Sequence, residues 1–179
     1  MTQRASRATS SPDRYGTVAR WIHWVSVVLI LAMMATGNRA ASIADPDTSL
    51  LLLRLHVPIG LLVFALTLGR IVWWWRFDTK PAALPMPGWQ ARAAHAVHVL
   101  FYVVILGMGA SGIGMLVLSG AGSVIVGGAA SALPDFWTVA PRTPHGLGAR
   151  AMAALIVFHV GAALYHHVVL RDGLLRRMG

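Results

Sequence analysis

The sequence predicts an all-α integral membrane protein, a four-helix bundle with both termini in the cytoplasm. Hydrophobic residues make up 56% of its 179 residues, and the mean hydropathy is +0.64, both too high for an ordinary soluble domain. Four apolar stretches are long enough to cross a bilayer, which takes about 20 helical residues. A closed barrel is the other architecture that spans membranes, but these stretches lack the alternating pattern of barrel strands.

The four predicted spans run from Val18 to Thr36, from Leu50 to Trp75, from Ala93 to Leu118 and from His145 to Leu170. Residues 1–16 form a polar, basic cytoplasmic tail, and residues 17–179 form one membrane domain. Asp45 and Pro46 mark the start of the helix that holds the second span. Thr143 and Pro144 are the expected N-cap and first residue of the last helix, with His145 in its first turn.

Basic residues are distributed by topology. Eleven of the fifteen lie on one predicted side, namely Arg4, Arg7, Arg14, Arg20, Arg70, Arg76, Lys80, Arg92, Arg171, Arg176 and Arg177. The other side holds Arg39, Arg54, Arg142 and Arg150. The positive-inside rule therefore puts both termini in the cytoplasm. The formal charge of +9 does not indicate nucleic-acid binding, because the basic residues form no single patch.

Two further observations narrow the chemistry. The chain has no cysteine, which excludes disulfides, iron–sulfur clusters, thiolate metal sites and covalent haem attachment. The segment GMGASG, residues 107–112, matches a dinucleotide-binding pattern, but that reading needs a preceding strand, and none is predicted. Small residues at this depth instead let a helix or a flat cofactor approach closely. The glycine- and alanine-rich loop over residues 119–144 is expected to cap the outer end.

Four histidines fall at two depths. His145 and His159 are fourteen residues apart on one helix, so they share a face to within about 40° and differ in height by about 21 Å. With the predicted topology, His23 lies at the inner level of His159, and His56 lies at the outer level of His145. Histidine within a membrane span is costly and usually functional.

Two imidazoles from facing helices are the axial ligands of a low-spin b-type haem. Structural zinc would need four converging ligands, whereas these histidines are divided between two levels. The sequence therefore predicts two non-covalent haem b groups, ligated by His23 with His159 and by His56 with His145. Two alternatives stay open: histidines that join helices by hydrogen bonds, and a haem-free transporter that uses them as a proton relay.

Other polar residues near these levels are candidates for cofactor or substrate contact. Arg54 and Arg150 are positioned for the carboxylates of the outer haem and Arg70 for the inner region, unless they extend to lipid headgroups. Candidates for a quinone site at the inner end are His166, His95, His98 and Trp24. His95 and His98 are also alternative inner ligands or propionate partners, and an interfacial role is the alternative for His166.

The motifs resemble those of the bacterial cytochrome b561 family. They are RYGTVARWIHW, LHVPIGLLVFALTLGRIVW, HAVHVLFY, PHGLGARA and FHVGAALYHHVVLRDGLLRRM, and their order and spacing cover nearly the whole chain from Arg14 onward. The resemblance implies a di-haem cytochrome b of the bacterial inner membrane, with the same four histidine ligands.

The superoxide oxidase branch of the family further implies that superoxide is oxidised at the outer face and ubiquinone is reduced, with His166 at the matching quinone-contact position. An alternative from the same family is a membrane anchor that conducts electrons for a separate dehydrogenase or hydrogenase subunit.

Overall fold

The computed structural model describes residues 8–128 and 132–179, so Arg4 and Arg7 of the predicted tail lie outside it. Its long helices are α2 (Thr17–Ser42), α3 (Pro46–Arg76), α4 (Gly88–Leu118) and α6 (Arg142–Tyr165). A π-helical turn, η2 (His166–Leu170), continues α6. All four are long and apolar enough to cross a membrane, which confirms the predicted helical membrane bundle.

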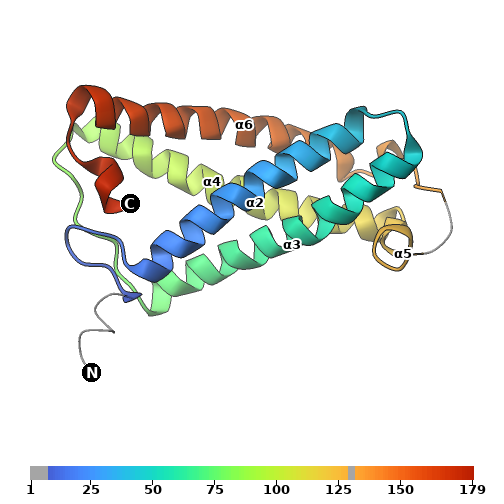
Figure 1. Ribbon diagram of the computed structural model, residues 1–179, viewed down its shortest axis with the longest axis horizontal. Coiled ribbons are helices and arrows are strands. Elements are labelled where there is room, and N and C mark those ends of the chain that lie inside the picture. Colours follow the sequence, from blue (N-terminus) through green and yellow to red (C-terminus); the bar gives the residue numbers. More distant parts are fainter. Residues whose placement is uncertain (1–7, 129–131) are drawn as a thin grey trace.

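Successive long helices run in opposite directions, and α2 packs mainly on α3 while α4 packs on α6 (Figure 1). One end of the bundle carries residues 8–16, the connection 77–87 and the C-terminal residues 171–179; we call it the inner end. The opposite, outer end carries the short helix α5 (Ala121–Ile125) (Figure 1). Four crossings return the chain to the side where it began, and the cytoplasmic placement of that side stays a prediction from charge.

The start of α3 follows the sequence prediction. Pro46 is its first residue, and the Asp45 carboxylate accepts a hydrogen bond from the Thr48 backbone N–H at 3.0 Å. The Thr48 hydroxyl also donates to Asp45. This hydroxyl and the backbone N–H together hold the pKa of the Asp45 carboxyl below its ordinary value.

The predicted start of the last helix is wrong by two residues. Helix α6 begins at Arg142 after Pro141, not at Pro144. The carbonyl of Pro141 accepts the His145 N–H at 3.1 Å, so the first turn forms ahead of the predicted cap. Pro144 is tolerated there because the N–H groups of a first helical turn have no intrahelical partner.

The core is thin. Ile30, Val63, Met108 and Met152, one residue from each long helix, form its buried cluster. Many other large apolar side chains are exposed, as expected for helices that face lipid. Glycines allow close helix contacts at this level: a Cβ at Gly148 would lie 2.6 Å from the Met108 side chain.

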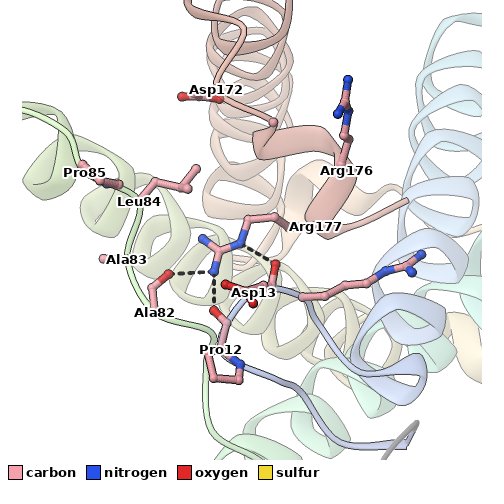
Figure 2. A pocket seen from close by; sticks show the side chains of 11 residues that line it. Pro12, Asp13, Ala82, Ala83, Leu84, Pro85, Asp172, Arg176 and Arg177 are labelled. Carbon is pink, nitrogen blue, oxygen red and sulfur yellow. Dashed lines mark hydrogen bonds between the residues drawn. The ribbon is translucent and has the colours of Figure 1, made fainter.

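The inner end is held together by polar contacts between segments far apart in the sequence. The buried Asp78 carboxylate accepts hydrogen bonds from the Ser10 N–H at 2.8 Å, the Ser10 hydroxyl at 2.9 Å and the Trp73 indole at 3.2 Å. The Arg177 guanidinium donates to the carbonyls of Pro12, Asp13 and Ala82 (Figure 2). Residues 8–16, 77–87 and 171–179 therefore form one structured cap.

Candidate functional site

Two pairs of imidazoles face each other between the helices. The ring centroids of His23, on α2, and His159, on α6, are 6.3 Å apart. Those of His56, on α3, and His145, on α6, are 6.2 Å apart. We call these the inner pair and the outer pair. The structure thus brings together the residues that the depth argument paired.

The separation within each pair suits a shared metal. A ring nitrogen binds a transition metal at about 2 Å and lies about 1 Å from its centroid, so trans imidazoles place their centroids about 6 Å apart. Among residues 8–128 and 132–179, no group of three or more His, Cys, Asp or Glu side chains is arranged to hold a metal ion. Each pair therefore suits a metal that brings its other ligands with it, as haem iron does.

The Nδ1 atoms of the outer pair are both anchored to backbone. His56 Nδ1 lies 2.9 Å from the Met33 carbonyl, and His145 Nδ1 lies 3.1 Å from the Met108 carbonyl. Since a carbonyl can only accept a hydrogen bond, Nδ1 carries the proton in both rings. The unprotonated Nε2 of each ring is then free to bind a metal, and the hydrogen bond fixes the ring orientation.

A short repeated motif builds both anchors, and the sequence analysis missed it. Residues 33–37 read MMATG and residues 108–112 read MGASG, which share the pattern M-x-A-[ST]-G. In each copy the hydroxyl donates to the methionine carbonyl that meets the ring, at 3.1 Å for Thr36 and 3.0 Å for Ser111. The Ser111 hydroxyl also lies 3.0 Å from His145 Nδ1, and Thr36 lies 3.5 Å from His56 Nδ1.

The glycine of each copy leaves room for the ring. A Cβ at Gly37 would lie 2.7 Å from His56 Cε1, too close for an unchanged ring, and a Cβ at Gly112 would lie 3.4 Å from His145 Cε1. The repeat itself is the signal that could have located these residues, because the same five-residue pattern occurs at the outer half of two spans.

The inner pair has different neighbours. His159 lies 5.5 Å from His98 and 5.4 Å from Phe101, measured between ring centroids. His23 lies 5.2 Å from Trp24 in the same measure. Neither ring of the inner pair accepts or donates a hydrogen bond within the described part of the chain. His98 is therefore brought to the inner pair through its contact with His159, whereas no ring contact joins His95 to this pair among the described residues.

Two arginines at the inner end have an unsatisfied buried atom. The Nε atoms of Arg20 and Arg70 are buried and have no hydrogen-bond partner among the described residues. Arg70 also interacts electrostatically with His23, His98 and His159. A buried guanidinium N–H without a partner is costly, and a haem propionate is a carboxylate that would satisfy it. Arg20 was not singled out by the sequence analysis, although it precedes His23 by three residues and so shares its helix face.

The arginines predicted for the outer level are more exposed than Arg20 and Arg70 at the inner end. Arg54 is exposed and donates to the Val124 carbonyl of α5 at 3.3 Å, and Arg150 is exposed. Arg142 lies over the Trp137 ring, 4.3 Å from its centroid. The apolar side of α5 is buried, so part of the predicted outer cap packs against the bundle; residues 129–131 of that loop lie outside the described structure.

His166 and Trp24, two quinone-site candidates, are both engaged at the inner end. His166 Nδ1 lies 2.5 Å from the Asp172 carboxylate. The Trp24 indole donates to the Met178 carbonyl at 2.9 Å. The π-helical turn ends at Arg171, which has a left-handed backbone with φ of 52°, and this turn brings Asp172 back to His166. Such non-glycine residues are uncommon and often accompany functional sites.

Asp172 lines a pocket of about 500 Å³ at the inner end (Figure 2). Its wall also contains Arg14, Ala83, Leu84 and Arg176. Partial burial raises the pKa of the Asp172 carboxyl, but the hydrogen bonds from His166 and from the Leu174 N–H outweigh it and leave that pKa below its ordinary value.

The fold and the paired imidazoles define a membrane helical bundle suited to haem ligation. The family model for prokaryotic cytochrome b561 matches residues 14–179, and the chain belongs to this family. Membership implies b-type haem and electron transfer in a multi-pass protein of the bacterial inner membrane.

Two relatives from Escherichia coli (strain K12) are similar over nearly their whole length. Cytochrome b561 homolog 1 is 26% identical over 175 residues, which is 93% of this chain and 97% of the relative. Cytochrome b561 homolog 2 is 27% identical over 187 residues, which is 95% of this chain and 93% of the relative.

Proposed function

We propose that this protein is a di-haem membrane cytochrome b that oxidises superoxide at its outer end and reduces ubiquinone at its inner end. The inner pair, His23 and His159, ligates one haem b, and the outer pair, His56 and His145, ligates the other. The observation that carries the proposal is the presence of two imidazole pairs, 6.3 and 6.2 Å between centroids, at two levels of one bundle.

Each haem supplies an iron that gains and loses one electron. The chain's residues bind and orient. Arg20 and Arg70 each have a buried N–H that would bind a propionate at the inner level. With both imidazoles of a pair holding the iron, each haem would supply electron transfer to and from substrates that do not bind the iron directly. The ubiquinone site is proposed at the inner end, where His166 and Asp172 are hydrogen-bonded beside a pocket.

Stopped-flow spectroscopy of the purified single chain tests this function. Superoxide should reduce the haems within the mixing experiment, and a short-chain ubiquinone should reoxidise them. Haems that superoxide leaves oxidised, while dithionite reduces them, would contradict the proposed donor. Haems that stay reduced in the presence of the quinone would contradict the proposed acceptor.

A second candidate function is an electron conduit for a separate redox subunit. The weak outer charge favours it. The outer segments carry four arginines against three aspartates, namely Arg39, Arg54, Arg142 and Arg150 against Asp45, Asp47 and Asp135, and Arg142 stacks on Trp137. A surface that attracts a small anion is usually more strongly positive. In this case the single chain would be inert to superoxide, and haem reduction would require an added dehydrogenase or hydrogenase.

A further inference from the structure

We propose that the two copies of M-x-A-[ST]-G, residues 33–37 and 108–112, set the direction of electron flow. By hydrogen-bonding His56 and His145, they give the outer haem a lower reduction potential than the inner haem. Electrons that enter at the outer end then run energetically downhill to the inner end. This inference rests on the proposed function, since it requires a haem at each imidazole pair.

The structural basis is a difference between the two levels. In the outer pair, both Nδ1–H groups are within 2.9–3.1 Å of a main-chain carbonyl. His145 Nδ1 has a second acceptor, the Ser111 hydroxyl at 3.0 Å. In the inner pair, neither His23 nor His159 has a hydrogen-bond acceptor within the described residues, and both rings instead meet aromatic and imidazole rings.

These contacts act on the iron through its ligand. A hydrogen bond from Nδ1–H to an acceptor makes the imidazole a more basic ligand, and a more basic ligand favours the oxidised, more positive iron. The outer haem is therefore harder to reduce than one held by rings without such bonds. Hydrogen bonds to the ligands of a metal are an established means by which proteins tune such potentials.

The charged groups act in the same direction. Arg70 is half-buried and interacts electrostatically with both rings of the inner pair, so its charge favours the reduced iron there. At the outer level, Arg54 is exposed and bound to the Val124 carbonyl, and Arg142 lies on Trp137. Solvent weakens the effect of the exposed Arg54 on the iron. Arg142 is half-buried and interacts electrostatically with one outer ring, His145, whereas Arg70 interacts with both inner rings.

Redox potentiometry of the holoprotein, followed by visible and EPR spectroscopy, tests the inference without any substrate. The wild type should titrate in two waves, and His145→Ala should abolish the wave of lower potential. Ser111→Ala removes one acceptor and should raise that wave, changing the equilibrium of electron sharing between the haems about threefold, or roughly 30 mV for one electron. The EPR signal of the outer haem should change in the same variant.

Ser26→Ala is the matched control. Ser26 lies three residues after His23 on the same helix face, and within the described residues its hydroxyl donates only to the Ile22 carbonyl, so both waves should stay in place. Thr36→Val is a second variant with a smaller expected shift, since Thr36 Oγ1 is 3.5 Å from His56 Nδ1. Loss of the higher wave in His145→Ala, or an unmoved lower wave in both Ser111→Ala and Thr36→Val, would overturn the inference alone. Fewer than two haems in the wild type would contradict the proposed function as well.

Discussion

Gly37 shows how one absent methyl group shapes the outer site. Its backbone lies directly beside the His56 ring, where a Cβ would come within 2.7 Å of Cε1 and 2.9 Å of Nδ1. The ring can reach the Met33 carbonyl only because position 37 carries no side chain. The requirement comes from a neighbouring helix and not from the backbone conformation of Gly37 itself.

Gly37→Ala is therefore expected to displace His56 from the Met33 carbonyl and to reduce the occupancy of the outer haem. Haem quantitation and EPR spectra of the purified variant would measure this loss, with the inner signal retained. Gly107→Ala is the control, because a Cβ there meets no atom of the described residues within 4 Å. An unchanged outer signal in Gly37→Ala would show that the ring is not confined in this way.

His145→Ala tests whether the two levels are independent. Because His145 and His159 are separated by about 21 Å along α6, loss of one ring should leave the other pair's geometry unchanged. The variant should lose the outer haem and keep the inner low-spin spectrum. Equal loss of both haems would contradict separate sites.

The four paired histidines could be predicted because helical periodicity and topology fix the depth of a residue. His145 and His56 were placed at one level from sequence numbers and charge alone. The roles of the Met33 and Met108 carbonyls could not be predicted, because every residue has a main-chain carbonyl and the sequence does not mark one from another. Which carbonyl meets a neighbouring ring depends on how the two helices are rotated. Arg20 was missed because a basic residue near a membrane boundary is ordinarily explained by topology.

At the level of elements, the end of α6 carries the feature with a defined pH dependence. The π-helical turn and the left-handed Arg171 place Asp172 against His166. The pKa of the Asp172 carboxyl is below its ordinary value of 3.8 in the folded protein. A carboxyl with a lowered pKa stabilises the fold fully above its ordinary pKa and loses that effect as the pH falls through the folded value.

Asp172→Asn should therefore lower the thermal unfolding temperature at neutral pH, and the difference from wild type should shrink as the pH falls below 3.8. The asparagine keeps an oxygen that can accept from the Leu174 N–H, so the turn itself is retained. Asp13→Asn, in the wall of the same pocket, is the control. A difference between wild type and Asp172→Asn that does not change with pH would rule out this explanation.

The four long helices were the most predictable elements, because the thickness of the bilayer sets the minimum length of an apolar helix that crosses it. The Asp45–Pro46 start was correct, since a carboxylate cap followed by proline is a local signal. The predicted start of α6 was wrong because Thr143–Pro144 is also a polar residue followed by proline, the usual sequence of a helix start. In the structure a turn forms before it, since the Arg142 N–H already donates to the Val139 carbonyl. The contact between α5 and Arg54 joins residues seventy positions apart, and no local pattern reports it.

At the level of the whole molecule, the inner cap connects the ends of the chain to the connection between α3 and α4. Arg177 alone reaches three carbonyls from two other segments, at 2.7 to 3.1 Å (Figure 2). Such a charged donor fixes segments that have few apolar contacts of their own.

Arg177→Ala should destabilise the folded protein by about 1.5–3 kcal/mol, the range for a hydrogen bond to a charged group. Thermal unfolding in detergent, followed by circular dichroism, would measure it. Arg176→Ala removes the adjacent, exposed arginine and should have a small effect. Equal effects of the two substitutions would indicate a response to net charge and not to these contacts.

The central claim is that one chain holds two haem b groups, each between a pair of histidines. Haem quantitation with reduced-minus-oxidised spectra of the purified protein, and EPR of the oxidised form, tests it most directly. The account predicts two low-spin, non-covalent b haems per chain. A single haem, a high-spin signal from an unligated axial position, or a colourless protein that uses its histidines as a proton relay would contradict it.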